Sequence, residues 1–213
     1  VPFSDPMADG PAIQEASQRA LAAGTTMHGI LDMIRQARHK TDRPMILFSY
    51  YNVILQYGVE QLARDSAAAG VDGWLVVDVP AEESAEVRPI IEKHGLHWIT
   101  LLAPTTPTDR MQKLLSKATG FVYYITVTGV TGARDSLPED LTESLRKVTA
   151  MSSSPVVAGF GISSPEMAAG VAEYADGVVV GSALVQRLAK AEGPESGIRE
   201  CAEFVTDLAK ALR

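Results

Sequence analysis

Residues 156–163, with the sequence VVAGFGIS, form an apolar run that passes directly into a glycine-rich turn. Residues 177–183, GVVVGSA, repeat this pattern, and their turn opens the next helix. Continuously apolar strands are typical of parallel sheets, in which both faces are buried. Each of these strands is therefore expected to be buried and to end in a loop whose glycines let a ligand approach the backbone closely.

The same alternation of apolar runs and amphipathic helices extends through the rest of the chain. Strands are expected at residues 45–50, 73–77, 98–102, 121–127, 156–159 and 177–180. Helices are expected near residues 12–23, 26–38, 58–69, 81–93, 108–117, 141–151, 165–173, 181–188 and 197–212. Strands that alternate with helices indicate βαβ units, and therefore parallel strands joined by right-handed crossovers.

An open doubly wound sheet and a closed barrel both satisfy this pattern. The barrel is favoured because the chain has no early G-x-G-x-x-G turn, and because polar or glycine-rich residues follow every strand rather than one switch point. We therefore predict an α/β fold, a (β/α)8 TIM barrel of the phosphate-binding type with about six strands present, and a single incomplete domain over residues 1–213. The turn-rich opening, VPFSDPMADGP, predicts that the first strands lie outside this sequence.

Composition and charge exclude several classes of protein. The 213 residues are 46% hydrophobic, and the chain has a net charge of −7 without clusters of Lys and Arg, so neither nucleic acid nor an anionic membrane is an expected partner. The four histidines lack a ligand spacing, so no metal site is expected, and the single cysteine, Cys201, excludes an internal disulfide. No apolar run reaches the length of a membrane span, and a cytoplasmic protein is expected.

The glycine-rich loops after the last two strands are candidates for a phosphate site. Gly161 follows one strand, while Gly181 and Ser182 follow the next and open a helix. Barrels commonly hold phosphate at this place, on backbone N–H groups and a helix N-terminus. Gly132 in the preceding loop would add another amide. The alternative is that these glycines only make tight turns, but their joint placement on neighbouring strand ends favours a phosphorylated substrate.

Carboxylates and tyrosines at strand ends and in loops are further candidates. Asp9 lies in the opening loop and Asp78 ends a strand, where a side chain reaches the mouth of a barrel. Each aspartate also fits a helix cap or a turn. Tyr50 and Tyr123 lie at or within strands, where tyrosines serve either as packing with a bonded hydroxyl or as substrate contacts.

The opening residues also carry a specific resemblance to a known family. PFSDPMADGPAIQ, at residues 2–14, closely resembles the signature of the tryptophan synthase alpha chain family. In the family's order and spacing, the resemblance continues through YN at 51–52, DVP at 78–80, GVTG at 129–132, GFGIS at 159–163 and GSA at 181–183. It implies retro-aldol cleavage of indole-3-glycerol phosphate to indole and glyceraldehyde 3-phosphate without a cofactor. It also implies transfer of indole to a pyridoxal-phosphate beta subunit, in an alpha2beta2 complex.

The resemblance implies roles for individual residues as well. Asp9 matches the catalytic aspartate, which accepts the indole N–H. Tyr123 matches a tyrosine near the glycerol chain, whereas Tyr50 and Asp78 match residues that line the indole side or close the site. Thr131 matches a loop threonine that closes towards the aspartate when substrate binds. The phosphate cradle of the family is matched by Gly132, Gly161, Gly181 and Ser182.

One member of the family's catalytic pair is not matched by any residue of this sequence. The resemblance places that residue, a glutamate on the second strand, upstream of Val1. A polypeptide of these 213 residues is therefore expected to have little or no lyase activity alone, and to be unable to close an eight-stranded barrel. Three alternatives remain open: a non-catalytic module that keeps phosphate binding and beta-subunit contact, a stand-alone lyase that releases indole, and a strand-exchanged dimer.

Overall fold

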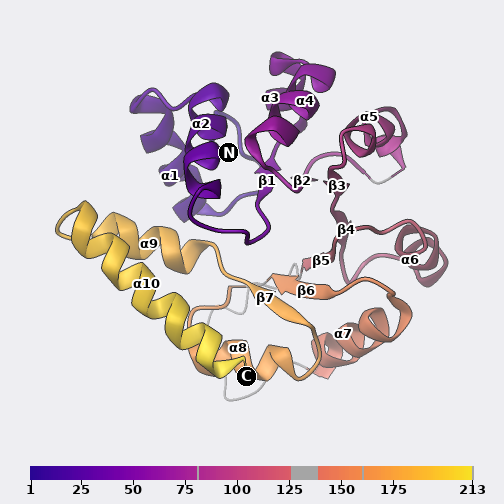
Figure 1. The fold of residues 1–213 in the computed structure, drawn as a ribbon. Helices are drawn as coiled ribbons and strands as arrows, with labels where there is room; N and C mark the ends of the chain where they lie inside the picture. Colours follow the sequence, from indigo (N-terminus) through magenta and orange to yellow (C-terminus); the bar gives the residue numbers. More distant parts are fainter. Residues whose placement is uncertain (81, 126–138, 160, 213) are drawn as a thin grey trace. The chain divides into compact units, whose positions relative to one another are not determined.

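The computed structural model describes residues 1–80, 82–125, 139–159 and 161–212 (Figure 1). The chain divides into two compact units, Val1–Thr100 and Leu101–Arg213. Each unit has an apolar core of its own. The prediction of one domain over residues 1–213 stays a prediction.

The first unit contains a parallel sheet in the order β1 (Ile46–Ser49), β2 (Gly73–Val76) and β3 (His97–Trp98). Its helical elements are α1 (Pro11–Ala22), α2 (Met27–Arg38), α3 (Tyr51–Tyr57), α4 (Val59–Ala69), the 3-10 helix η1 (Glu83–Glu86) and α5 (Arg88–Lys93). The strand β2 is buried along its whole length, and Trp74 at its centre is 1% exposed. Its neighbour β1 is less completely covered, because Phe48 is 41% exposed.

The second unit contains a sheet in the order β4 (Thr100–Leu102), β5 (Val122–Ile125), β6 (Val156–Gly159) and β7 (Gly177–Val179). The pairs β5–β6 and β6–β7 are parallel. Its helices are α6 (Thr108–Leu115), α7 (Glu139–Met151), α8 (Pro165–Ala172), α9 (Ser182–Lys190) and α10 (Pro194–Ala211). Val122, Tyr124, Val156 and Ala158 of the strands are fully buried among residues of these helices.

The helix expected at residues 81–93 is wrong as a continuous element. In the described part of this range the structure has η1 and then the short helix α5, which begins at Arg88. Pro89 explains the break: its ring clashes with the carbonyl group four residues earlier and it has no N–H to donate, so it is tolerated only in the first turn of a helix.

Two further elements differ from the sequence expectation. The strand expected at 98–102 is divided into β3 and β4, although the N–H of Ile99 between them still donates to the carbonyl of Trp74 at 2.9 Å. The short helix α3 was not expected, because no capping side chain precedes it. Its first N–H, that of Tyr51, instead finds an acceptor in Asp78, 27 residues later.

Two equivalent contacts fix the amino-terminal ends of the sheets. Asp72 directly precedes β2: its N–H donates to the carbonyl of Met45 at 2.8 Å, and its carboxylate accepts the N–H of Met45 at 2.7 Å. Asp176 directly precedes β7 and makes the same pair of bonds with Val156, at 2.8 and 2.7 Å. Each aspartate thus joins two neighbouring parallel strands just where the ladder begins.

Replacing Asp72 by alanine is expected to lower the free energy of unfolding by about 1–3 kcal/mol, because partly buried donors lose their acceptor. The donors are the N–H of Met45 and the guanidinium of Arg38, which lies 2.6 Å from the same carboxylate oxygen. Chemical denaturation of the two proteins measures the difference. Asp42→Ala, at an exposed position, is the matched control. Equal unfolding midpoints for Asp72→Ala and the control would contradict this assignment.

Candidate active site

Asp9 and Tyr50 are brought together although they are 41 residues apart in the sequence. The Tyr50 hydroxyl donates to Oδ2 of Asp9 at 2.9 Å and accepts the backbone N–H of Ala8 at 3.0 Å. Tyr50 directly follows β1, and its ring lies against that of Phe3 with centroids 5.1 Å apart. The end of β1 therefore holds the predicted catalytic aspartate in place.

The loop that carries Asp9 is a defined turn. The N–H of Asp9 donates to the carbonyl of Pro6 at 3.1 Å, and the N–H of Met7 donates to that of Asp5 at 2.9 Å. The side-chain amide of Gln14, on α1, donates to the carbonyl of Asp9 at 2.8 Å. Local bonds thus set the backbone of the loop, while Tyr50 is the contact from a distant element that reaches its carboxylate.

The hydroxyl of Tyr50 is a permanent donor. Burial raises the pKa of Tyr50 to about 12, and the hydrogen bond to Asp9 acts in the same direction, whereas the N–H of Ala8 lowers it. Because this pKa lies far above neutrality, the hydroxyl keeps its proton in the range where enzymes work. Its single proton is directed at the Asp9 carboxylate.

Asp78 has a structural contact in this arrangement. Its Oδ1 accepts the backbone N–H of Tyr51 at 2.8 Å, at the first residue of α3. Tyr50, the residue before the helix, makes no side-chain capping bond, so Asp78 satisfies this end of the helix from the neighbouring strand. This geometry supports the helix-cap alternative for Asp78, and its contact with substrate stays a prediction.

In the second unit, Tyr123 lies over the end of β6. A Cβ atom built on Gly159 would be 2.2 Å from the Tyr123 hydroxyl oxygen, far closer than atoms can approach. Glycine is therefore required at the last residue of β6, because the tyrosine ring occupies the space of its side chain. The hydroxyl of Tyr123 thus lies beside the point where the first candidate phosphate loop begins.

The two candidate phosphate loops leave the sheet side by side. Gly159 of β6 pairs with Val179 of β7, so the loops that follow these strands start from the same edge. Gly161 has a φ of +33°, which favours glycine, and a Cβ on Gly161 or Gly181 would meet nothing within 4 Å. Gly181 precedes α9, which begins at Ser182 without a side-chain cap. The arrangement offers open backbone at the start of a helix, as an anion site requires.

Two predicted site residues lie outside the described residues: Thr131 and Gly132. The remaining ones fall in two groups, with Asp9, Tyr50 and Asp78 in the first unit and Tyr123, Gly161, Gly181 and Ser182 in the second. The structure brings together the members within each group. Among the described residues, no cluster of His, Cys, Asp or Glu side chains is arranged to hold a metal ion, and no helix is long and apolar enough to cross a membrane.

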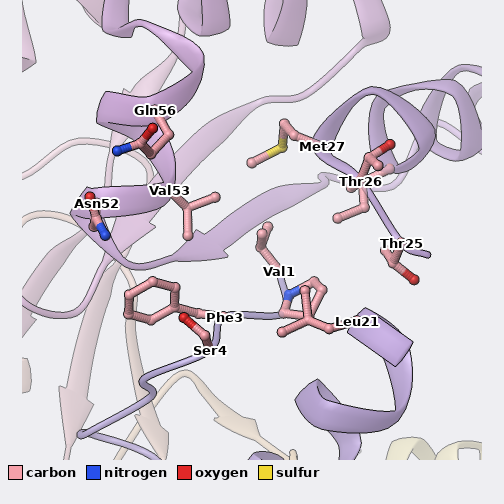
Figure 2. Close-up of a pocket in the computed structure, with 12 residues that line it drawn as sticks. Val1, Phe3, Ser4, Leu21, Thr25, Thr26, Met27, Asn52, Val53 and Gln56 are labelled. Carbon is pink, nitrogen blue, oxygen red and sulfur yellow. The ribbon is translucent and has the colours of Figure 1, made fainter. Parts of the chain in front are cut away.

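A pocket of about 350 Å³ lies next to the segment that leads to Asp9, and no sequence motif predicts it. Figure 2 shows Asn52, Val53 and Gln56 of α3 on one side and Met27, at the start of α2, on the other. The complete lining is Val1, Pro2, Phe3, Ser4, Leu21, Thr25, Thr26, Met27, Ile30, Asn52, Val53 and Gln56. Its walls come from segments far apart in the sequence, so no local pattern could have predicted it.

A second pocket, of about 620 Å³, lies on the other side of α3 and is acidic. It is lined by Tyr51, Asn52, Leu55, Asp78, Val79, Glu82, Glu83, Ala85 and Glu86. Its four carboxylates make it unsuitable for a phosphorylated ligand, because like charges repel. The phosphate site is therefore expected at the loops after β6 and β7 instead.

Neighbouring parallel strands that each end in a glycine-rich loop define the class of the phosphate-binding (β/α)8 barrels. Comparison with known proteins narrows this class to one family. The family described as tryptophan synthase alpha chain matches residues 1–213, and the chain belongs to this family. The resemblance drawn from the sequence motifs is thereby confirmed.

Individual relatives and solved structures agree with this assignment. The chain is 51% identical to the tryptophan synthase alpha chain of Geobacter sulfurreducens over 212 residues, which cover 100% of this chain and 80% of that protein. It is 44% identical to that of Caldanaerobacter subterraneus, with the same coverage. A crystal structure of the alpha chain from Legionella pneumophila matches with a TM-score of 0.89 and 37% identity, covering 100% of this chain and 78% of that one. The predicted fold class is confirmed by this neighbour.

A further structural neighbour is a chain from a solved complex. A chain in the crystal structure of the tryptophan synthase complex from Pyrococcus furiosus matches with a TM-score of 0.87 and 33% identity, covering 98% of this chain and 83% of that one.

Proposed function

We propose that this protein cleaves indole-3-glycerol phosphate to indole and glyceraldehyde 3-phosphate, as the alpha subunit of tryptophan synthase in tryptophan biosynthesis. Membership of the alpha chain family supports this function. The observation that carries it is the carboxylate of Asp9, which a buried tyrosine holds in a defined loop at the end of β1. As an enzyme of a biosynthetic pathway with small, water-soluble intermediates, the protein is placed in the cytoplasm.

The chemistry requires a fixed carboxylate. In the retro-aldol step, C3 of the indole gains a proton and the hydroxyl on the glycerol chain loses one. The bond that breaks joins C3 to the carbon that bears this hydroxyl. Positive charge develops on the indole ring before the bond breaks, and a carboxylate that accepts the indole N–H stabilises this charge. Asp9 has this role in our proposal, and no cofactor takes part.

The proton transfers need a second group. The family resemblance assigns them to a glutamate that has no match among residues 1–213. A polypeptide of these residues alone is therefore expected to turn over slowly, if at all, because loss of one member of a catalytic pair commonly lowers the rate by orders of magnitude. The same polypeptide keeps Asp9 and the phosphate loops, so it is expected to retain part of its affinity for substrate.

The substrate phosphate is assigned to the loops after β6 and β7. Gly161, Gly181 and Ser182 lie on adjacent strand ends, and the start of α9 supplies backbone N–H groups and the positive end of a helix dipole. Gly132 and Thr131 belong to this proposal through the family resemblance. Tyr123, whose ring lies over Gly159, is proposed through the family resemblance to lie near the glycerol chain of the substrate.

The beta subunit of tryptophan synthase is the proposed protein partner, in an alpha2beta2 complex. The complex from Pyrococcus furiosus among the structural neighbours supports this partner. The segment at residues 2–5 resembles part of the beta-contacting surface of the family, and residues 2–4 line the 350 Å³ pocket together with α3. We therefore place the contact at this pocket, which is mainly apolar and opens next to the Asp9 loop.

Replacing Gln56 by arginine is expected to weaken binding of the beta subunit at least about tenfold, because an unpaired charge would be buried in the contact. Gln56 is exposed and lines the pocket, so the substitution is compatible with the fold. Gln36→Arg adds the same charge at an exposed position of α2 outside the pocket. Titration calorimetry with the purified beta subunit compares the two variants, and equal affinities would place the contact elsewhere.

Growth of a bacterial strain that lacks its own alpha chain tests the function. The gene of this protein is expected to restore growth without tryptophan, and the same gene with Asp9→Asn is not. Added indole is the control, because it bypasses the alpha reaction and supports growth in both cases if the beta subunit is intact. Failure of the wild-type gene in cells that grow on indole would argue against the proposed reaction, provided that the protein is expressed and folded.

A further inference from the structure

The Tyr50 hydroxyl holds the Asp9 loop at two points. It donates to the carboxylate of Asp9 at 2.9 Å and accepts the N–H of Ala8 at 3.0 Å. One atom therefore fixes both the backbone before the aspartate and the orientation of its side chain. Among the residues that the structure describes, no hydrogen bond reaches the other carboxylate oxygen of Asp9, Oδ1.

Tyr50 is itself held rigidly. It is 6% exposed, and its ring lies against that of Phe3 with an angle of 31° between the ring planes. Its backbone connects the last residue of β1 to the first residue of α3, whose N–H is bound by Asp78 at 2.8 Å. The position of the hydroxyl is thus set by the end of β1, by the start of α3 that Asp78 binds, and by the ring of Phe3.

We propose that Tyr50 is a positioning residue, which holds Asp9 through Oδ2 and so presents Oδ1 to the N–H group of the substrate. The inference deepens the proposed function and rests on it, because it assigns to Asp9 the acceptor role described above. It differs from a role in lining the indole site, since the effect comes from the hydroxyl group and not from the ring.

The geometry requires that the hydroxyl act as donor to the aspartate. The hydroxyl oxygen accepts the N–H of Ala8, and the hydroxyl proton is donated to Oδ2 of Asp9. The high pKa of Tyr50 is consistent with this, because a neutral phenol keeps its proton beside a carboxylate. A carboxylate with one oxygen bound and the other open is oriented for a single further donor, as the indole N–H provides.

Tyr57, the last residue of α3, provides a matched control. The Tyr57 hydroxyl donates to Oδ2 of Asp65 at 2.9 Å, and the Tyr57 ring lies against that of His28 with centroids 4.8 Å apart. This pair repeats the Tyr–Asp bond and the ring contact of Tyr50, but it joins α3 to α4 and contains no predicted site residue. Loss of the Tyr57 hydroxyl is expected to change local stability without affecting the contacts of the Asp9 loop.

The test compares Tyr50→Phe with Tyr57→Phe in the protein as its gene encodes it, assayed together with the beta subunit. Tyr50→Phe keeps the ring and is expected to lower kcat for indole release about tenfold to a hundredfold, because a misplaced catalytic group reduces the rate by this order. KM is expected to change by less than about threefold, since the residue positions a catalytic group rather than binding the substrate. Tyr57→Phe is expected to leave both constants unchanged.

Amide hydrogen exchange around Ala8 gives a second readout that does not depend on turnover. The N–H of Ala8 loses its acceptor in Tyr50→Phe and is expected to exchange about tenfold faster or more, whereas Tyr57→Phe leaves it unchanged. A Tyr50→Phe protein with wild-type kcat, or one in which KM alone changes, would overturn the inference. If the wild-type protein released no indole, the proposed reaction would fail, and unchanged exchange at Ala8 in Tyr50→Phe would then overturn the positioning role as well.

Discussion

Replacing Asp9 by asparagine is expected to lower kcat for indole release by about a thousandfold, within the range typical of a lost catalytic carboxylate. Asparagine has the size of aspartate, and its carbonyl oxygen can still accept a hydrogen bond from Tyr50, whose hydroxyl oxygen lies 2.9 Å from Oδ2 of Asp9 in the wild type. The variant lacks the negative charge that stabilises the indole ring as positive charge develops. The loss is therefore expected in kcat, with the fold preserved.

Steady-state assays with indole-3-glycerol phosphate, alongside circular dichroism, measure this effect. Glu15→Gln removes a negative charge from an exposed position on α1, near Asp9 in the sequence but outside the site, and is the control. It is expected to behave like the wild type. Should Asp9→Asn retain more than about a tenth of the wild-type rate, the carboxylate would not have the electrostatic role proposed here.

Replacing Gly159 by alanine is expected to lower the free energy of unfolding by about 1–3 kcal/mol, as over-packing of a core does. The added Cβ would lie 2.2 Å from the hydroxyl oxygen and 2.5 Å from Cζ of Tyr123, so the tyrosine has to move. Because we propose that Tyr123 lies near the glycerol chain, turnover is expected to fall together with stability. The variant thus tests whether the packing of Tyr123 against Gly159 affects turnover as well as stability.

Gly170→Ala is the matched control for this substitution. Gly170 lies within α8, and a Cβ there would meet nothing within 4 Å. Alanine in a helix interior is more favourable than glycine by about 0.5–1 kcal/mol, so this variant is expected to be slightly more stable than the wild type and fully active. Thermal unfolding of both variants gives the comparison; a Gly159→Ala protein as stable and active as Gly170→Ala would show that Tyr123 does not occupy this space.

The strands were well predicted from sequence because they are short, continuously apolar and bounded by turn residues. The strand expected at 156–159 is β6 with the same bounds, and the one expected at 73–77 differs from β2 by a single residue. Such segments are stable only where both faces of the strand are buried, as in a parallel sheet, so the local pattern is sufficient. The family was predictable for a different reason: the motif at residues 2–14 is long and specific.

Elements that depend on distant partners could not be predicted in the same way. The helix α3 begins at a residue whose N–H is bound by Asp78, in the turn that follows β2. The site has the same limitation: the residue types of Asp9 and Tyr50 made them candidates, but the bond between them joins residues 41 apart and depends on the fold. The requirement for glycine at 159 likewise follows from the Tyr123 ring and not from a turn.

The most direct test of the proposed reaction is a spectroscopic assay of indole release from indole-3-glycerol phosphate by the purified protein as its gene encodes it, with and without the beta subunit. We predict that indole and glyceraldehyde 3-phosphate form in equal amounts, that the beta subunit increases the rate, and that Asp9→Asn lowers the rate about a thousandfold. A folded wild-type protein that binds the beta subunit and releases no indole would contradict the account.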